Sequence, residues 1–244
     1  MTQREPEDDV PTSVPAAGDR RRFPAPAHLV FFHGPMDCGK STLALQVDHN
    51  QSRQGRHGLL LTQGDRSAAP QISSRVGLSR PAVEVDADTD LQLLVRDRWA
   101  EGNRVDYLIV DEAQFLTAAQ VDQLASLVDD WHVDVYAFGL TTDFRARLFP
   151  GTQRLLEVAD DVQRVQVEVL CWCGLPGLLN ARVVDGAMVR SGETVVVADT
   201  APADPPSAAE GPSPAVRYQV LCRRHYVRGQ LDPSTAGPGQ LALT

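Results

Sequence analysis

The sequence predicts an α/β fold, in which a parallel β-sheet accounts for most of the chain and a small β-rich lobe follows at the C-terminal end. Between residues 28 and 169, short apolar runs alternate with amphipathic stretches, as expected for βα units. After residue 170, paired cysteines and Val-rich and Gly-rich segments indicate a lobe of different construction. A chain of 244 residues has room for one full-sized core and one small appended module.

The individual elements follow from the spacing of the apolar residues. Compact apolar runs predict strands near residues 29–33, 58–62, 106–110, 133–138 and 163–169. Stretches with their apolar residues on one helical face predict helices at residues 40–53, 89–100, 117–130 and 152–158. Because strands alternate with helices, the sheet should be parallel, and ligands bind at the carboxyl edge of such sheets.

Composition divides the chain into segments. Residues 1–27 are rich in Pro, Asp, Glu and Arg and poor in apolar residues, which predicts a disordered N-terminal arm. We expect the core at residues 28–169, the C-terminal lobe at residues 170–228 and a flexible tail at residues 229–244. Within the lobe, the Pro-rich and Ala-rich stretch 199–215 predicts a flexible insertion.

Charge and hydropathy exclude several classes of protein. A net charge of −9 provides no broad basic surface, so we expect no nucleic-acid partner. No apolar run approaches the roughly 18 residues of a membrane span, and the N-terminus lacks the apolar stretch of a signal peptide. We therefore predict a soluble, cytoplasmic protein with no membrane partner.

The most specific motif is the loop after the first predicted strand, which reads GPMDCGKST at residues 34–42. Its spacing matches the P-loop, in which backbone N–H groups surround phosphate oxygens at a helix N-terminus. Lys40 would neutralise the β- and γ-phosphates of ATP, and the Ser41 hydroxyl would bind Mg²⁺. The expected ATP-binding residues are Gly34, Pro35, Met36, Asp37, Cys38, Gly39, Lys40, Ser41 and Thr42. The alternatives are a Gly-rich turn with Lys40 in solvent and, for Cys38, a small buried side chain in place of a reactive thiol.

Two carboxylates, Asp111 and Glu112, follow the apolar run at residues 107–110. Since ligands bind beyond the carboxyl ends of parallel strands, both side chains should face the crevice that holds the P-loop. We expect Asp111 to act on the Mg²⁺ side and Glu112 to be the catalytic base that accepts the proton of an attacking hydroxyl. The alternative is that the pair forms an acidic N-cap of the following helix.

Three of the four cysteines predict a metal site. A disulfide between Cys171 and Cys173 would close a very tight ring, which disfavours a disulfide framework. With Cys222 and His225, these cysteines supply the four soft ligands of a structural Zn²⁺ site. The C-x-C spacing of the first pair is tighter than the usual C-x-x-C, and the alternative is a set of reduced, buried thiols.

Five motifs occur in order along the chain: GPMDCGKST at 34–42, QISSRVGL at 71–78, DEAQF at 111–115, GLTTDF at 139–144 and CWCG at 171–174. In this combination the chain resembles the bacterial branch of the type II thymidine kinases, from about residue 28 to about residue 228. The resemblance implies a RecA-like P-loop NTPase core and a zinc-binding lobe whose loop, the lasso, closes over the nucleoside. It also implies a homotetramer, feedback inhibition by dTTP, and ATP-dependent phosphorylation of thymidine, or of deoxyuridine, at the 5′-hydroxyl in nucleotide salvage. The family's general base falls on Glu112.

The resemblance further implies a nucleoside site. Its members would be Met36, Phe115, Leu140, Phe144 and Phe149 around the base, Tyr218 near the sugar or the base edge, and the lasso residues Thr194, Val195, Val196 and Val197. An apolar slot of this kind suits a flat ring, and plain core packing is the alternative for the residues at 140, 144 and 149.

The lasso departs from the family pattern. Relatives carry an Ile-Gly-Gly stretch where this chain reads Val197-Ala198-Asp199-Thr200, followed by the insertion.

Arg66 and Arg75 are candidates for phosphate contact or loop ordering, and a solvated arginine is the default for either.

Two other functions compete with the kinase. The DEAQ sequence beside a P-loop is also typical of nucleic-acid-dependent ATPases, but a helicase needs a second RecA-like domain and a basic track. A zinc-ribbon interaction module would leave the P-loop and Glu112 without a role.

Overall fold

The computed structural model describes residues 26–63, 69–192 and 216–233. Several predictions therefore lie outside the described residues: nearly all of the predicted arm, Arg66, the lasso residues 194–197, the insertion at 199–215 and the tail beyond residue 233. Of the helices in the described ranges, none has the length and apolar content needed to cross a membrane.

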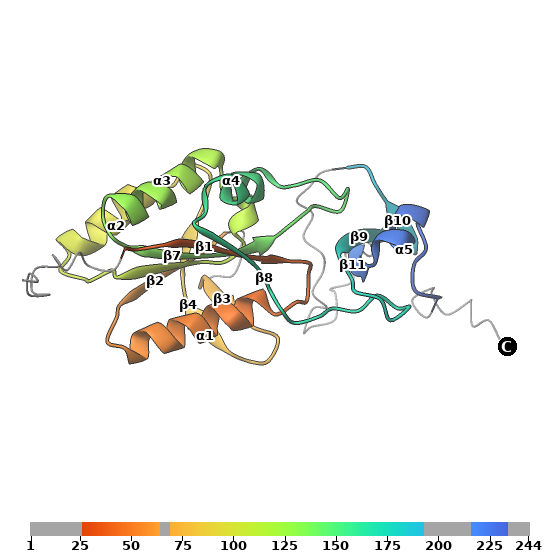
Figure 1. The fold of residues 1–244 in the computed structure, drawn as a ribbon, viewed down its shortest axis with the longest axis horizontal. Coiled ribbons are helices and arrows are strands. Elements are labelled where there is room, and N and C mark those ends of the chain that lie inside the picture. The colour runs from red at the N-terminus through yellow and green to blue at the C-terminus, as the bar shows by residue number, and fades with distance from the viewer. Residues whose placement is uncertain (1–25, 64–68, 193–215, 234–244) are drawn as a thin grey trace, which may run out of the picture.

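A six-stranded parallel sheet forms the centre of the larger lobe, as the sequence predicts (Figure 1). Its strands lie in the order β5 (Val83–Val85), β2 (Gly58–Gln63), β6 (Tyr107–Val110), β7 (Asp134–Leu140), β1 (Leu29–Gly34) and β8 (Asp161–Arg164). Every neighbouring pair is parallel. The carboxyl ends of β6, β7 and β1 therefore meet at one edge of the sheet.

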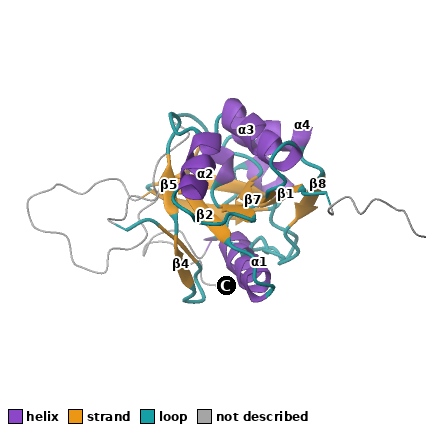
Figure 2. Cartoon of the chain, turned by 90° about the vertical axis from the view of Figure 1, so that its left-hand side faces the viewer, coloured by secondary structure: helices purple, strands orange, loops and turns teal. Residues whose placement is uncertain are grey.

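Helices cover both faces of this sheet (Figure 1 and Figure 2). One face carries α1 (Lys40–Arg53), and the other carries α2 (Leu91–Ala100), α3 (Ala118–Asp129) and α4 (Pro150–Val158). Alternate residues of β6 enter opposite layers: Leu108 and Val110 belong to one apolar cluster, Tyr107 and Ile109 to the other. β6 is apolar throughout because both of its faces are covered.

Caps explain where the predicted helices begin. The Asp90 side chain accepts a hydrogen bond from Leu93 N–H, so α2 starts two residues later than residue 89. Thr117 and Gln120 form a capping box before α3. α4 begins at Pro150, earlier than the predicted residue 152, because proline suits the first turn of a helix.

Two predictions about strands were incomplete. The strand expected at 163–169 lies at 161–164, because β8 has β1 as its one partner among the described residues, and β1 ends at Gly34. A hairpin of β3 (Gln71–Ser73) and β4 (Ser79–Pro81) was not predicted, nor was β5. Strands of three residues contain too few side chains to show an alternating pattern.

The C-terminal lobe is a small antiparallel sheet with one short helix. Its strands lie in the order β10 (Ala187–Val189), β9 (Leu179–Val184) and β11 (Val216–Leu221), and α5 (Arg223–Arg228) follows. The β-rich prediction is confirmed, whereas α5 was not predicted. The buried cluster of the lobe consists of Cys171, Ala181, Leu221, Cys222 and Tyr226.

Candidate functional site

The loop between β1 and α1 has the backbone of a phosphate-binding loop. Gly39 is the N-cap of α1 with a φ of 80°, so the first N–H groups of the helix are open towards the loop. A Cβ at Gly34 would lie 2.6 Å from Cys38 Sγ, which leaves no room for a side chain there. Lys40 is 8% exposed, and its Nζ donates to Pro35 O at 2.8 Å. The lysine thus lies inside the loop and not in solvent.

Asp111 contacts the P-loop directly. Ser41 Oγ donates to Asp111 Oδ2 at 2.8 Å, and Glu112 N–H donates to Asp111 Oδ1 at 3.0 Å. Burial and the charge of Glu112 raise the pKa of Asp111 to about 6. A hydroxyl and a carboxylate in contact, close to a lysine, form a donor set that suits Mg²⁺ with bound phosphates.

Glu112 lies at the same edge of the sheet in a left-handed backbone conformation. Its φ is 55°, and it precedes the short 3₁₀ helix η1 (Ala113–Phe115) without a side-chain capping bond. Glu112 Oε2 accepts a hydrogen bond from Gln114 Nε2 at 2.5 Å, and Gln114 Oε1 accepts one from Leu140 N–H at 2.9 Å. The buried Gln114 therefore fixes the carboxylate relative to the end of β7. The cap of α3 is Thr117, so the acidic pair does not serve that role.

The residues predicted to surround a base lie beside this edge. Leu140, Phe144 and Phe149 are all at least nine-tenths buried, and the last two belong to the loop after β7. Phe115, from η1, packs edge-to-face against Phe149 with 5.5 Å between the ring centroids. Burial of this degree is expected for core packing as well as for a base pocket, so both interpretations stay open.

The C-terminal lobe contacts the loop after β7, which contains Phe144. Tyr226 OH donates to Phe144 O at 2.5 Å. The guanidinium carbon of Arg182 lies 3.7 Å from the centroid of the Phe144 ring, and its Nε donates to Tyr218 OH at 3.1 Å. Phe144 is thus held between the two lobes, and Tyr218 lies close to it through the shared arginine.

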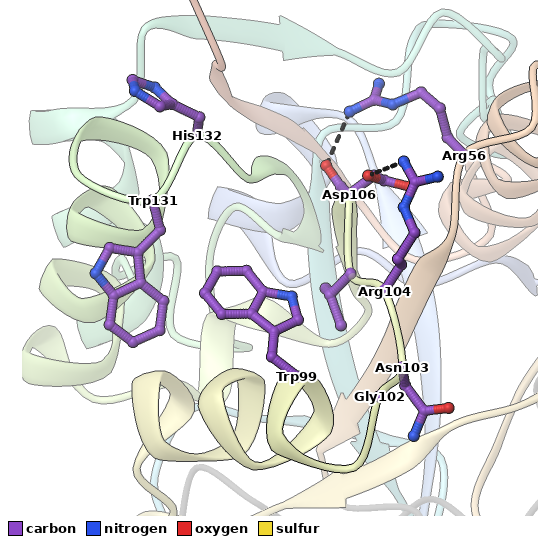
Figure 3. Close-up of a pocket in the computed structure, with 9 residues that line it drawn as sticks. Arg56, Trp99, Gly102, Asn103, Arg104, Asp106, Trp131 and His132 are labelled. Carbon is purple, nitrogen blue, oxygen red and sulfur yellow. Dashed lines mark hydrogen bonds and ion pairs between the residues drawn. The ribbon is translucent and has the colours of Figure 1, made fainter.

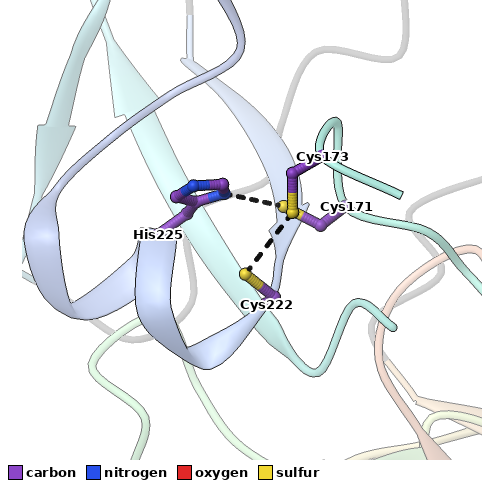
Figure 4. A group of neighbouring side chains, drawn as sticks. All are labelled: Cys171, Cys173, Cys222 and His225. Carbon is purple, nitrogen blue, oxygen red and sulfur yellow. Dashed lines mark hydrogen bonds between the residues drawn. The ribbon is translucent and has the colours of Figure 1, made fainter. Parts of the chain in front are cut away.

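The predicted metal ligands form a compact cluster (Figure 4). The ligand atoms of Cys171, Cys173, Cys222 and His225 all lie within 4.8 Å of one another. Cys173 Sγ and Cys222 Sγ are 3.9 Å apart, and Cys171 Sγ and His225 Nδ1 are 3.4 Å apart. A tetrahedral zinc site would place two sulfurs ~3.8 Å apart and a sulfur and a nitrogen ~3.5 Å apart. The donor set and its spacing therefore fit Zn²⁺.

The pKa shifts of His225 and Cys222 favour metal binding, whereas the shift of Cys171 does not. Burial and the nearby charge of Arg224 lower the pKa of His225, which favours the neutral imidazole that metals bind. A hydrogen bond from the backbone N–H of His225 lowers the pKa of the Cys222 thiol, whereas burial raises the pKa of Cys171. The indole of Trp172 stacks on the imidazole, with 4.1 Å between ring centroids, and so fixes its orientation.

A hollow of about 480 Å³ lies at the opposite, amino-terminal edge of the sheet (Figure 3). The rings of Trp99 and Trp131 lie 5.3 Å apart along its wall. Arg104 donates to the Asp106 carboxylate and Arg56 donates to the Asp106 carbonyl, each at 2.8 Å. Because its arginines are engaged by protein acceptors and it lies away from the P-loop, this hollow is not the phosphate site.

Arg75 is an exposed residue of the hairpin between β3 and β4. Its Nη2 lies 2.6 Å from Asp37 Oδ1 of the P-loop. Of the two proposed roles for this arginine, the contact favours loop ordering, although an exposed ion pair of this kind contributes only ~0–1 kcal/mol.

Sequence reasoning missed four buried polar residues near the site: Gln114, Asn180, Arg182 and Tyr226. Two of them, Asn180 and Arg182, alternate with apolar residues along β9. A polar side chain at the inward-facing positions of a strand is a usable signal, but it requires that the register of the strand be known.

Known proteins match this chain across both of its lobes. The family model "Thymidine kinase" matches residues 27–226. A thymidine kinase of Streptomyces coelicolor is 53% identical over 214 residues, which cover 88% of this chain and 94% of that protein. One of Cutibacterium acnes is 51% identical over 203 residues, or 83% and 89% of the two chains. One of Legionella pneumophila is 34% identical over 209 residues, or 84% and 92%.

Proposed function

This chain belongs to the thymidine kinase family, and we propose that it transfers the γ-phosphate of ATP to the 5′-hydroxyl of thymidine in nucleotide salvage, with deoxyuridine as a related acceptor. The observation that carries the proposal is the contact between Ser41 and Asp111, which joins the P-loop to the acidic end of β6. Phosphate binding and proton acceptance can therefore occur in one crevice.

The P-loop holds the phosphates of ATP. The N–H groups at the start of α1 face the phosphate oxygens, and Lys40 neutralises their charge. Ser41 and Asp111 would hold Mg²⁺, which when bound neutralises negative charge on the β- and γ-phosphates. This arrangement positions the terminal phosphate at the carboxyl edge of the sheet, where Glu112 also lies.

Glu112 accepts the proton of the thymidine 5′-hydroxyl as that oxygen attacks the phosphorus. The hydrogen bond from Gln114 holds one carboxylate oxygen, so the other is presented to the substrate. Since Gln114 also accepts a hydrogen bond from Leu140 N–H, it holds both the catalytic base Glu112 and Leu140, a residue of the proposed nucleoside site. Positioning of this kind accounts for much of the catalysis in phosphoryl transfer.

The nucleoside site lies between the two lobes. We propose that Leu140, Phe144, Phe149, Phe115 and Met36 surround the thymine, that Tyr218 lies near the sugar or the base edge, and that residues 194–197 take part in recognition of the base. The contact of Arg182 with both Phe144 and Tyr218 supports this assignment, because it joins proposed pocket residues of both lobes.

The Cys3His cluster is proposed as a structural zinc site. Cys171, Cys173, Cys222 and His225 would occupy all four positions around Zn²⁺, which leaves none open for substrate. The metal would tie the loop at residues 171–173, before β9, to the start of α5, directly after β11. We further propose a cytoplasmic homotetramer that is inhibited by dTTP, as the family resemblance implies.

The test is phosphate transfer from ATP·Mg²⁺ to thymidine, deoxyuridine, deoxycytidine and deoxyadenosine, measured in parallel with ATP hydrolysis in the presence of single-stranded DNA. We expect monophosphate from thymidine and, more weakly, from deoxyuridine, with no stimulation by DNA. DNA-stimulated hydrolysis without any nucleoside product would instead identify a nucleic-acid-dependent ATPase.

A further inference from the structure

A side chain of the C-terminal lobe reaches the P-loop itself. Asn180, in β9, is 2% exposed, and its Oδ1 accepts a hydrogen bond from Met36 N–H at 2.9 Å. Its Nδ2 donates to Thr142 O at 3.4 Å, in the loop after β7. One buried carboxamide thus joins the P-loop, the loop after β7 and the C-terminal lobe.

The contact with Met36 differs from the other interactions of the P-loop. The N–H of Met36 is directed at Asn180, so it does not belong to the set of amides that would face phosphate. It instead fixes the loop between Gly34 and Gly39, where the chain turns from strand to helix. Losing the acceptor would leave a partly buried N–H group without its protein partner, which destabilises this turn of the P-loop.

Strand pairing within the C-terminal lobe, and not the P-loop, fixes the position of Asn180. β9 pairs with β11 along its whole length, which puts Asn180 opposite Val220. Val220 lies two residues before Cys222, a member of the metal cluster. The strand pairing therefore connects the proposed zinc site to the backbone of the proposed ATP site.

Met36 belongs to both proposed substrate sites: its backbone lies in the P-loop and its side chain is assigned to the base pocket. We infer that Asn180 is a positioning residue, which holds Met36 so that the ATP loop and the nucleoside pocket keep their relative places. This inference rests on the proposed function and names a residue that the family motifs quoted above do not include.

The first experiment measures the contact itself. Hydrogen–deuterium exchange is followed in the P-loop peptides of the full-length protein, for wild type, Asn180→Leu and the control Asn103→Leu. Asn103 is exposed and lies at the opposite edge of the sheet. We expect the Met36 amide to exchange about 5- to 100-fold faster in Asn180→Leu only, as the loss of a buried partner predicts. An unchanged exchange rate would overturn the inference.

The second experiment measures KM and kcat, to test whether Asn180 positions the sites of both substrates. In Asn180→Leu we expect KM for ATP and KM for thymidine to rise together, with kcat changed less and bound zinc unchanged. A merely structural role would lower the active fraction, and thus the apparent kcat, with both KM values intact, and this result would also refute the inference. Asn180→Asp keeps the Oδ1 acceptor but loses the donor, so it should restore slow exchange at Met36.

Failure of the proposed function can be told apart from failure of this inference. If the wild-type protein phosphorylates none of the four nucleosides, the equilibrium affinity for ATP still tests Asn180. Weaker ATP binding in Asn180→Leu than in Asn103→Leu would then support the inference, and equal binding would contradict it.

Discussion

The sheet core and the C-terminal lobe differ in what stabilises them. The larger apolar cluster of the core contains 19 buried residues, whereas the cluster of the lobe contains five, two of which are cysteines. A fully buried large apolar side chain contributes only ~1.5–3 kcal/mol, and each ordered residue loses conformational entropy of similar size. The core can therefore fold on apolar burial, while we expect the lobe to depend on the proposed zinc site and on its contacts with the core.

This difference in stabilisation matches a division of labour. The groups proposed for chemistry, Lys40, Asp111 and Glu112, all belong to the core. The lobe contributes contacts that hold core segments in place: Asn180 on the P-loop and Tyr226 on the loop that carries Phe144. Changes in the core should therefore alter the chemical step, and changes in the lobe should alter substrate binding.

The largest effect is expected from Glu112→Gln. The amide has nearly the shape of the carboxylate but cannot accept the proton of the attacking hydroxyl, so kcat for thymidine should fall by roughly 10² to 10⁴. The affinity for ATP and the zinc content should stay close to those of wild type, because the substitution leaves the P-loop and the lobe untouched. Rapid-quench measurement of a single turnover isolates the chemical step, and a full rate would contradict the assigned base.

A smaller effect is expected from Cys222→Ser, a substitution in the C-terminal lobe. The variant should lose its zinc, measured by atomic absorption, because it removes one of four ligands. Without the metal the lobe should lose its hold on Met36 and Phe144, which lowers kcat/KM for thymidine by about 5- to 150-fold if the loss of these contacts costs about 1–3 kcal/mol in total.

ATP binding by the same variant tests whether the core stays folded when the lobe loses its metal. We expect the Cys222→Ser protein to retain a folded core, with cooperative thermal unfolding and measurable affinity for ATP. Collapse of the whole protein on loss of the metal would show that the two lobes form one cooperative unit. Chelation of zinc from the wild-type protein should reproduce the effect of the substitution.

Parts of the molecule that rest on local pattern could be predicted from the sequence. The Gly-rich loop between β1 and α1 follows from its motif, and the acidic end of β6 follows from a compact apolar run that stops at Asp111. The meeting of Ser41 with Asp111, 70 residues apart, could be anticipated because the P-loop that leads to Ser41 and the acidic pair both follow the carboxyl ends of strands in a parallel sheet. The grouping of Cys171, Cys173, Cys222 and His225 could be anticipated because few residue types bind zinc.

Other features could not be predicted, because they depend on which surfaces meet in space. The bond from Met36 to Asn180 joins residues 144 positions apart, in two lobes whose packing no local pattern specifies. The role of Gln114 requires knowledge that η1 lies beside the end of β7. The extent of β8 depends on where its single neighbour β1 ends, which is a property of the pair and not of either strand.

The smallest effect is expected from a matched pair of glycine substitutions, one in each lobe. His132, after α3, and Asp185, between β9 and β10, both have left-handed backbone, with φ values of 55° and 49°. This conformation is strained for residues with a Cβ, so His132→Gly should stabilise the core by about 0.5–1 kcal/mol and raise its melting temperature by ~1–4 °C. Asp185→Gly should gain less, because aspartate tolerates the left-handed region in a hairpin turn before Gly186.

The two glycine variants test whether the lobes unfold separately. Calorimetry of the zinc-loaded protein should show His132→Gly moving the transition of the core and Asp185→Gly moving that of the lobe, with kcat and KM unchanged in both. Neither residue contacts the proposed substrate sites, so a kinetic change in either variant would mean that strain in these turns is transmitted to the crevice. If both substitutions shifted one common transition, the lobe would derive its stability from the core, and the metal would serve chiefly to orient Asn180 and Tyr226.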